Sequence, residues 1–409
     1  MPHLPSQDED APQTISFPPV TKDHIQNCSY DSWFPKYKSS CIKSRIIPLP
    51  QVVVSYLQED GIVLADEDDT VGGPEEDEWH SAGASTTQNQ AQDDSSDDED
   101  AEPEEERLPP NLRFPEVHQM IKDKIEELGG SVAPKLNWSS PKDAKWISPH
   151  QNTLKCTTPN DIYLLLKSSS FVSHDLVHAF DDCTDAPPKR PFSPVLVLRP
   201  FFNPHVALEF RCFVKHRSLI GICQRDLNHY NFLEGLKPNL WKKINNFFRD
   251  TLRFTFPDSC FTFDVYVPEN SFADDGLGKV RLMDINPWAL HTDSLLFTWE
   301  ELLEKEVPRP LYGSVSTEDV ADVSGGETTA DEMDDEDEYR PGRLPELRIV
   351  EKDDPAAYNF STPQYSAHKL PKEVVDASMA GEGGLREFAQ QWKDITEGRG
   401  GDMWNQPQQ

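Results

Sequence analysis

The spacing of apolar residues predicts helices in the first half of the patterned part of the chain and strands in the second. In "FPEVHQMIKDKIEELGG", residues 114–130, apolar residues recur every three or four positions, and two glycines follow as a C-cap. In "TPNDIYLLLKSSSF", residues 158–171, Thr158 stands at the N-cap position and Pro159 at the first helical position. Both segments therefore predict helices, with "SVAPKLNW" (131–138) as a short strand between them.

Apolar and polar residues alternate with a period of two through most of residues 195–286, which predicts β-strands. Two of these strands flank the turn-like "KHR" and predict a β-hairpin. A helical stripe in "NLWKKINNFFRDTLRF" interrupts the strands, and "FTWEELLEKE" predicts a short closing helix. The predicted strands are "PVLVLRPF" (194–201), "VALEFRCFV" (206–214), "SLIGICQRD" (218–226), "FTFDVYV" (261–267) and "KVRLMDIN" (279–286). The pattern predicts the α+β class, with antiparallel sheets flanked by helices.

The charge of the chain is concentrated in two acidic segments. The formal net charge is -33, but Glu59–Glu106 holds 20 acidic residues, Glu318–Glu338 holds 11, and neither contains Lys or Arg. Without these segments the chain is nearly neutral. Such runs repel themselves and have few apolar anchors, so we expect disordered acidic segments. Their acidity argues against a nucleic-acid partner; they either keep the protein soluble or meet a basic surface on a protein partner.

These features predict a folded domain interrupted by an acidic insertion. Residues 17–58 and 108–308 carry the apolar patterns of the folded domain, and residues 59–107 form the insertion between them. We expect residues 1–16 to be disordered. The tail, residues 309–409, is expected to be mostly disordered and polar, except that "LPELRIV" makes the segment 341–351 apolar enough to dock in an extended form.

Cysteine usage and the N-terminus favour a cytoplasmic protein. The chain has 7 Cys, widely scattered and without a Cys-x-x-Cys pair, which suits a reducing compartment and argues against a zinc ribbon or a disulfide framework. The first residues, "MPHLPSQDED", lack the basic and apolar regions of a signal peptide. No apolar run approaches the length of a membrane span, so no membrane partner is expected. No heptad pattern demands more than a monomer.

Polar side chains inside the apolar strands are the first candidates for chemistry. Asp284 and Asn286 are two residues apart, so they point to the same face of their strand. A hairpin with "FTFDVYV" that sets Pro268 opposite Val280 makes Asp284 face the carboxylate of Asp264 on that strand. Two facing carboxylates are unfavourable without a proton or a cation between them, and Mg²⁺ prefers oxygen ligands. The pattern favours a metal site; the alternative is two carboxylates that cap turns.

Charged residues on the preceding strands are candidates for phosphate contacts. Glu209 and Arg211 share a strand face. They form either a structural salt bridge or a site at which the arginine fork binds phosphate. Arg225 ends the next strand, and strand parity leaves open whether it faces Arg211.

A lysine at the end of another predicted strand is a further candidate. Lys135 is followed by Trp138, Ser139 and Ser140, and an ammonium group with hydroxyl groups nearby could hold phosphate oxygens. The alternative is a solvated turn residue, which is the commoner role of a lone lysine beside proline. No Walker A, Rossmann or kinase glycine pattern is present, so a nucleotide site here would use another cradle.

The order of these motifs resembles the cell-division-cycle 123 family. The resemblance rests on "PKLNWSSPKDAKWI", "LVLRPFFNPHVALEFRCFV", "GICQRDLNHYN", "FTFDVYV" and "RLMDINPW". Members of this family are ATP-grasp proteins that assist assembly of eukaryotic translation initiation factor 2. The resemblance therefore implies an ATP-grasp-like two-lobed fold that binds ATP and Mg²⁺. It also implies a partner, the C-terminal domain of the gamma subunit of that factor.

The resemblance implies roles for individual residues as well. Asp264, Asp284 and Asn286 would hold Mg²⁺. ATP would be contacted at the phosphates by Lys135, Trp138 and Ser140 and by Arg211 and Arg225, at the ribose or adenine by Glu209, and at the adenine by Pro200, Phe201 and Phe202.

The expected function is that of an ATP-binding assembly chaperone that regulates translation initiation and the cell cycle. The alternatives are an ATP-grasp ligase that forms an acyl-phosphate and a scaffold with a vestigial nucleotide site. A ligase needs a second cluster of residues for its acceptor, and the sequence shows no clear one. His205, His229 and His291 are candidates by residue type alone, so the sequence favours a chaperone over an enzyme.

Overall fold

The computed structural model describes residues 17–66, 108–307, 310, 339–340 and 343–352. Within these ranges the chain has a mixed α+β fold with a three-stranded and a five-stranded sheet, which confirms the predicted class. The helices are α1 (Lys22–Asn27), α2 (Tyr30–Tyr37), α3 (Gln51–Gln58), α4 (Pro110–Arg113), α5 (Pro115–Glu127), α6 (Pro159–Lys167), α7 (Ser170–Val177), α8 (Leu233–Phe247) and α9 (Trp299–Glu304). The strands are β1 (Arg45–Pro48), β2 (Val132–Lys135), β3 (Val195–Pro200), β4 (Glu209–Lys215), β5 (Ser218–Gln224), β6 (Phe261–Tyr266), β7 (Arg281–Pro287) and β8 (Glu346–Arg348).

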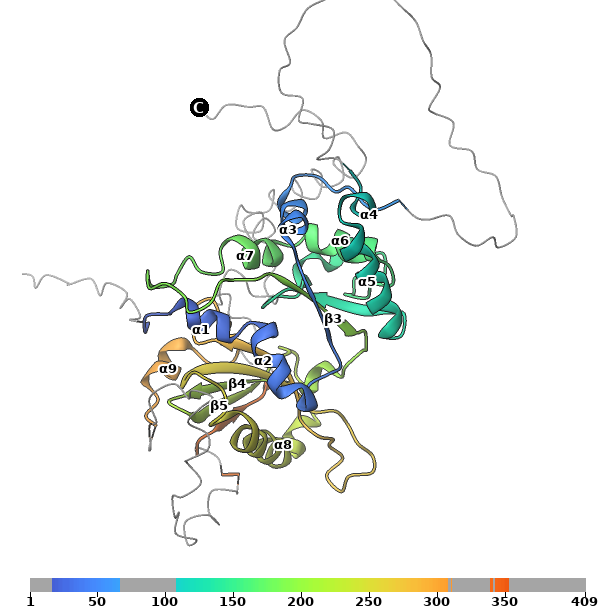
Figure 1. The fold of residues 1–409 in the computed structure, drawn as a ribbon. Coiled ribbons are helices and arrows are strands. Elements are labelled where there is room, and N and C mark those ends of the chain that lie inside the picture. Colours follow the sequence, from blue (N-terminus) through green and yellow to red (C-terminus); the bar gives the residue numbers. More distant parts are fainter. Residues whose placement is uncertain (1–16, 67–107, 308–309, 311–338, 341–342, 353–409) are drawn as a thin grey trace, which may run out of the picture.

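The three-stranded sheet is the centre of a small lobe, the upper half of the molecule in Figure 1. Its order is β1-β3-β2, and both pairs are antiparallel. The central strand β3 is buried on both faces. Leu196 and Leu198 belong to the core formed with α3, α5, α6 and α7, whereas Val195 and Val197 belong to the core of the other lobe. The small sheet is thus packed directly against the large lobe.

Two helices of the small lobe have the ends that the sequence predicts. After α5, Gly129 and Gly130 have φ values of 97° and 81°, left-handed values that glycine adopts without strain. At the start of α6, Thr158 accepts a hydrogen bond from the backbone of Asp161, and the Asp161 side chain accepts one from the backbone of Thr158. Local sequence therefore fixes both helices.

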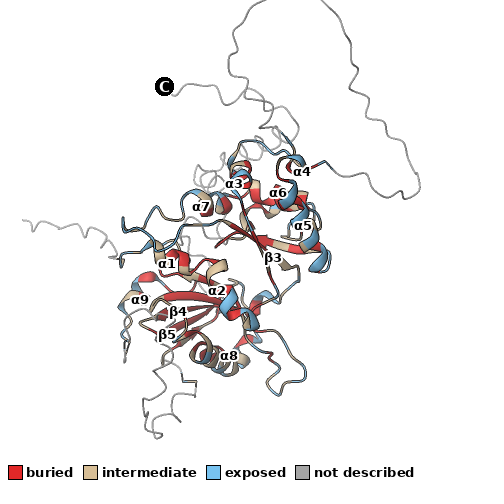
Figure 2. Cartoon of the chain, viewed as in Figure 1, coloured by how far each residue is buried: buried red, intermediate tan, exposed pale blue. Residues whose placement is uncertain are grey.

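The five-stranded sheet is the centre of the large lobe, in the order β7-β6-β4-β5-β8. Adjacent strands in this sheet are antiparallel, except that β5 and β8 run parallel to each other. The predicted hairpin forms from β4 and β5, in which Lys215 pairs with Ser218. The helix α8 covers one face of the sheet and shares a core with its strands (Figure 1). Figure 2 shows that the strands β4 and β5 are buried, while the outward surfaces of the helices are exposed.

The pairing of β6 with β7 sets two acidic residues opposite each other, as predicted. Asp264 is the register partner of Asp284. A β-bulge at Met283 shifts the register beyond this pair. The predicted opposition of Pro268 and Val280 is therefore wrong, and the carbonyl of Pro268 instead accepts from the backbone N–H of Gly278 at 2.6 Å.

The bulge at Met283 also decides which side chains share a face of β7. Leu282 and Ile285 belong to the core beneath α8. Met283, Asp284 and Asn286 line the opposite face, where the sheet meets the small lobe. Asp284 and Asn286 thus share a face as predicted, but a regular strand would have put Leu282 beside them.

Two predicted boundaries differ from the structure. The helix expected from residue 239 begins at Leu233 and carries Pro238 inside it. The described part of the chain continues to residue 66, eight residues into the predicted insertion. Tyr56 donates to the carbonyl of Val63 at 2.6 Å, and the amide of Asn160 exchanges two hydrogen bonds of 2.9 Å with the backbone of Ala65. These contacts attach the start of the acidic run to the small lobe.

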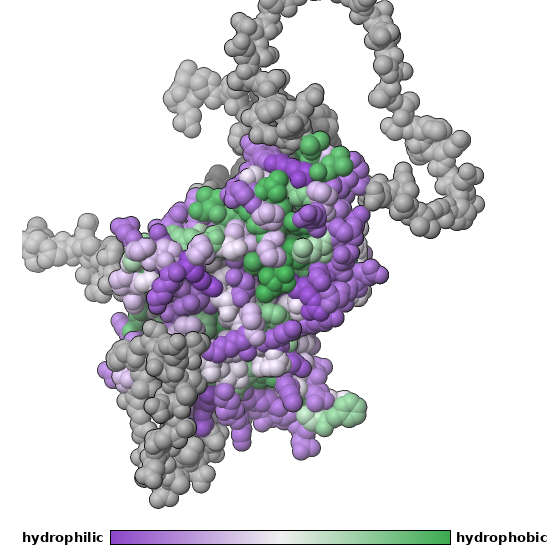
Figure 3. All heavy atoms as spheres, in the orientation of Figure 1, coloured by the Kyte–Doolittle hydropathy of each residue, from purple (hydrophilic) through white to green (hydrophobic). Residues whose placement is uncertain are grey.

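Most of the segments expected to be disordered, residues 1–16, 67–107, 311–338 and 353–409, lie outside the described residues. Within 341–351, the segment expected to dock in an extended form, Glu346–Arg348 form β8. Figure 3 shows a largely hydrophilic surface on which apolar side chains gather over the small lobe. No helix in the described part of the chain is long and apolar enough to cross a membrane.

Candidate functional site

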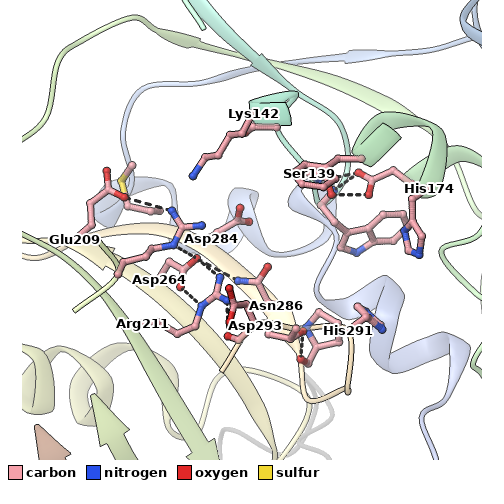
Figure 4. Close-up of a pocket in the computed structure, with 18 of the residues that line it drawn as sticks. Ser139, Lys142, His174, Glu209, Arg211, Asp264, Asp284, Asn286, His291 and Asp293 are labelled. Atoms are coloured by element: carbon pink, nitrogen blue, oxygen red, sulfur yellow. Dashed lines mark hydrogen bonds and ion pairs between the residues drawn. The ribbon is translucent and has the colours of Figure 1, made fainter. Parts of the chain in front are cut away.

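A cavity of about 280 Å³ lies between the two sheets, close to the lower limit of small-molecule sites at about 300 Å³. Two groups of charged and polar residues form its walls, and Figure 4 shows their labelled side chains around the space between them. The sheet wall, from β4, the end of β5, β6 and β7, consists of Glu209, Arg211, Arg225, Asp264, Asp284 and Asn286. The loop wall, from the segment after β2 and from α7, consists of Trp138, Ser139, Ser140, Lys142, His174 and Asp175.

Asp264 is the centre of the sheet wall. Its two carboxylate oxygens accept hydrogen bonds from Nε and Nη2 of Arg211, both at 2.8 Å, and one of them accepts from the amide of Asn286 at 3.3 Å. Arg225 Nε lies 3.3 Å from the same carboxylate. Burial raises the pKa of Asp264, but the charges of Arg211 and Arg225 outweigh burial and hold this pKa well below its usual range. Asp264 is therefore ionised at neutral pH.

The two arginines of the sheet wall differ in how fully they are engaged. Arg211 Nη1 donates to the carbonyl of Asp293 at 2.7 Å, so all three of its guanidinium nitrogens are engaged. Arg225 Nη1 lies 3.3 Å from Glu209 Oε2, while its buried Nε, although close to Asp264, makes no hydrogen bond to the described residues. Glu209 therefore pairs with Arg225 and not with Arg211, the salt bridge considered from the sequence. Strand parity left open whether Arg225 faces Arg211, and in the structure both arginines lie next to the carboxylate of Asp264.

Asp284 has a different kind of partner. The ammonium of Lys135, at the end of β2, donates to Asp284 Oδ2 at 2.5 Å. Lys135 has no exposed surface, and its Nζ lies 5.0 Å from the centre of the Tyr30 ring. Burial lowers the pKa of Lys135, and the Asp284 carboxylate opposes this shift. Lys135 thus lies behind the cavity surface and joins the small sheet to the large sheet.

The three residues predicted to hold a metal are brought together. Asp264 and Asp284 are paired across β6 and β7, and Asn286 lies on the same face. Two carboxylates and an amide oxygen form a donor set that suits a hard cation such as Mg²⁺, which completes its shell with water or phosphate. No cluster of three or more His, Cys, Asp or Glu residues among the described residues is arranged to hold a metal ion. The residues present fit Mg²⁺ with the amide as one of its ligands.

The loop wall is held in place by an acidic residue that the sequence reasoning did not identify. Asp175 on α7 accepts from the backbone N–H groups of Trp138 and Ser139 at 3.1 and 2.8 Å, and from the Ser139 hydroxyl at 2.8 Å. Burial raises the pKa of Asp175 to about 6. The indole of Trp138 donates to the carbonyl of Ile25 at 2.9 Å and stacks on Phe192. These contacts fix the segment that carries Ser139.

Lys142 is the second residue of the loop wall that the sequence did not single out. Figure 4 shows its ammonium pointing into the cavity. This ammonium has no hydrogen bond or ion pair to the described residues, and the backbone N–H of Lys142 donates to the carbonyl of Ser140 at 2.7 Å. The positive charge of Arg225, together with burial, lowers the pKa of Lys142 to about 7. Nothing in "SSPKDAKW" distinguishes Lys142 from Lys145, because the distinction lies in a long-range contact.

Two histidines meet at the other end of the cavity. His174 on α7 and His291 after β7 have ring centres 6.1 Å apart and come from different lobes. Burial and the neighbouring His174 lower the pKa of His291 to about 4. His205 and His229, the other two candidates by residue type, do not line this cavity. Of the three, the structure places His291 alone at the site.

The residues expected on the adenine side are not brought into this cavity. Pro200 ends β3 opposite Val132, and the backbone N–H of Phe201 donates to the carbonyl of Ser131 at 2.9 Å. Phe202 is 38% exposed, and its ring centre lies 5.9 Å from that of Tyr266. The role of these three residues at an adenine stays a prediction. The preceding residue of β3, Arg199, does line the cavity.

Fold and site together define a mixed α+β protein with a charged cavity between two sheets. A model of the D123 family matches residues 33–378 of the chain. The chain therefore belongs to the D123 family, which confirms the resemblance found in the sequence.

The relatives are similar over nearly their whole length. The chain is 51% identical to the "Translation initiation factor eIF2 assembly protein" of Botryotinia fuckeliana, over 94% of this chain and 90% of that protein. It is 43% identical to "Cell division cycle protein 123" of Aspergillus terreus, over 97% and 96%. The structure of Cdc123 from Schizosaccharomyces pombe is similar with 34% identity and a TM-score of 0.55, over 82% of this chain and all of that one.

Proposed function

We propose that this protein is an ATP–Mg²⁺-binding assembly factor for eukaryotic translation initiation factor 2. The assembly role is supported by relatives that are named eIF2 assembly proteins and align with nearly the whole chain. The nucleotide role is supported above all by one arrangement. The facing carboxylates Asp264 and Asp284 lie in a cavity whose opposite wall carries the ammonium of Lys142, which has no ion pair to the described residues.

Both walls would take part in binding. Lys142, the guanidinium of Arg225 and the hydroxyl of Ser140 are the donors suited to phosphate oxygens. Asp264, Asp284 and Asn286 would hold Mg²⁺, which when bound would offset part of the phosphate charge. Arg211, each of whose three guanidinium nitrogens already donates one hydrogen bond, would position Asp264 instead of reaching the phosphates.

The proposed partner is the gamma subunit of the initiation factor, through its C-terminal domain. The cavity lies between the lobes, so a ligand held by both walls would favour one relative position of the lobes. A partner that contacts both lobes would then bind with an affinity that depends on the nucleotide. This coupling is what distinguishes an assembly factor controlled by ATP from a passive scaffold.

An ATP-grasp ligase is the second candidate, and one observation favours it. Asp175, His174 and His291 line the same cavity beyond the charged sheet wall, which places acid–base groups where the sequence showed no second cluster. A ligase predicts release of ADP and phosphate that increases when a carboxylic-acid substrate is supplied. An assembly factor predicts no such increase with any carboxylate tested.

Isothermal titration of the isolated gamma subunit into the full-length protein tests the proposal. We expect the dissociation constant of the gamma subunit measured with ATP–Mg²⁺ to differ about tenfold from the one measured without nucleotide. Lys142→Met should reduce this difference, whereas Lys145→Met, which changes the same charge nearby, should leave it unchanged. If the gamma subunit binds under neither condition, the assembly proposal is wrong.

A further inference from the structure

The two facing carboxylates of the sheet wall have unlike partners. Asp264 accepts two hydrogen bonds from the fork of Arg211 and is nearly buried, with 5% of its side chain exposed. Asp284 is held by one ammonium contact from Lys135 and has 18% of its side chain exposed. The first carboxylate is closed within the sheet, whereas the second lies at the cavity surface.

The partners also differ in how easily they can change position. Arg211 comes from the same sheet as Asp264, as its direct register partner on β4, and a third acceptor fixes its guanidinium. Lys135 comes from the other sheet and offers a single charged group on a flexible stem. A buried ammonium needs a negatively charged partner, and either a carboxylate or a phosphate can fill this role.

We infer that Lys135 and Asp284 exchange partners together: phosphate takes over the Lys135 ammonium, and the released Asp284 carboxylate becomes available to the metal. This inference rests on the proposed binding of ATP–Mg²⁺. In the structure, Lys135 occupies the carboxylate that the metal requires. The metal alone must compete with a full positive charge at 2.5 Å, whereas the metal with phosphate does not.

The exchange acts on the contact between the lobes. Lys135 is the last residue of β2 in the small sheet, and Asp284 lies on β7 in the large sheet. A second link between the sheets, from Arg199 Nη1 to the carbonyl of Met283 at 3.2 Å, involves no carboxylate and is unaffected by the exchange. Loading of the site therefore removes one polar contact between the sheets, while the Arg199 link and the packing of Val195 and Val197 against the large lobe remain.

Mn²⁺ binding to the nucleotide-free, full-length protein tests the inference, with free Mn²⁺ measured by electron paramagnetic resonance. Lys135→Met removes the competing charge and keeps an unbranched side chain at a fully buried position. We expect this variant to bind Mn²⁺ alone about tenfold more tightly than the wild type, and to bind ATP more weakly. Lys142→Met is the matched control, because it removes a cavity lysine that does not contact Asp284. It should weaken ATP binding without tightening Mn²⁺ binding.

Lys135→Gln serves as a second variant and guards against a folding defect of the first, which circular dichroism would reveal. If both variants bind Mn²⁺ alone no more tightly than the wild type, while the wild type binds ATP with Mn²⁺, the exchange is wrong and the nucleotide site stands. If the wild type binds no ATP with or without metal, the proposed nucleotide function fails, and the exchange fails with it. Opposite changes in metal and ATP affinity in the Lys135 variants support the exchange.

Discussion

The sheet wall and the loop wall face each other across one cavity, yet their charged side chains differ in whether they are paired. On the sheet wall, Asp264 and Arg211 neutralise each other within a single sheet. On the loop wall, Asp175 is used to hold backbone N–H groups, and the ammonium of Lys142 is left without a partner among the described residues. The sheet wall therefore pairs its charges within the fold, while the loop wall keeps an amine that can carry a positive charge toward a ligand.

This difference separates stability from binding. Removing a charge from the sheet wall leaves its buried partner uncompensated, so the folded state is affected first. Removing the free charge from the loop wall affects the ligand first. The mutations below test this division in order of the expected size of their effects.

The largest effect is expected for Asp264→Ala. This change leaves Arg211 buried without its carboxylate and should lower the free energy of unfolding by about 3–5 kcal/mol. Urea denaturation followed by circular dichroism measures it. The double change Arg211→Met with Asp264→Leu should recover most of the stability and no ATP binding. If Asp264→Ala lowers the unfolding free energy by less than about 1 kcal/mol, the folded state does not depend on the ion pairs of the sheet wall.

A smaller effect is expected for the pH dependence of stability at the histidine end of the cavity. The folded pKa of His291 is lowered to about 4, so between pH 6.5 and 4 the unfolded chain takes up a proton that the folded protein does not. Stability should therefore fall as the pH decreases from 7 to 5, and His291 should account for about 2 kcal/mol of this loss. His174, His24 and Asp182 also act on His291 and remain in the variant, so comparison isolates His291.

The measurement is the difference in unfolding free energy between pH 7 and pH 5. Between these two pH values, the unfolding free energy of His291→Gln should fall by about 2 kcal/mol less than that of the wild type. His205→Gln, which changes an exposed histidine outside the cavity, should lose as much as the wild type. Equal acid sensitivity in His291→Gln and the wild type would show that burial at this end of the cavity does not exclude the proton.

The smallest effect on stability is expected for Lys142→Met. Lys142 is repelled by Arg225, so its removal should change the unfolding free energy by less than about 0.5 kcal/mol or raise it slightly. The same change should weaken ATP–Mg²⁺ binding about tenfold, because a charged donor to phosphate is lost. Urea denaturation and isothermal titration give the two values. A clear loss of stability without a loss of ATP affinity would contradict the role assigned to the loop wall.

The sequence predicted what depends on short range. The caps of α5 and α6 and the β4–β5 hairpin follow from neighbouring residues, and all three are observed. The facing of Asp264 and Asp284 was predicted from an opposition of Pro268 and Val280 that the structure does not have, and it is observed because the bulge at Met283 shifts the register by one residue. The bulge at Met283 was missed, although the spacing of Leu282 and Ile285, three residues apart in a strand of period two, is a sign of it.

The missing parts of the site depend on contacts between distant segments. The pairing of Arg211 with Asp264 requires β4 to lie beside β6, an order that strand patterns alone do not give. The reach of Lys135 to Asp284 joins residues of two different sheets. The contact of Asp175 with Ser139 joins α7 to the segment after β2 within the small lobe, and it too links residues far apart in the sequence. Local sequence predicts the elements, and their packing decides which charges remain free.

The most direct test is the titration of ATP into the full-length protein with and without Mg²⁺, repeated with Asn286→Ala. This change removes an expected metal ligand whose side chain makes a single hydrogen bond to the described residues, at 3.3 Å, so the fold should be little affected. We expect one-to-one, Mg²⁺-dependent binding in the wild type, and about tenfold weaker binding in Asn286→Ala only when Mg²⁺ is present. An absence of saturable binding in the wild type, or equal Mg²⁺-dependent affinity in both proteins, would contradict a nucleotide–metal site between the two sheets.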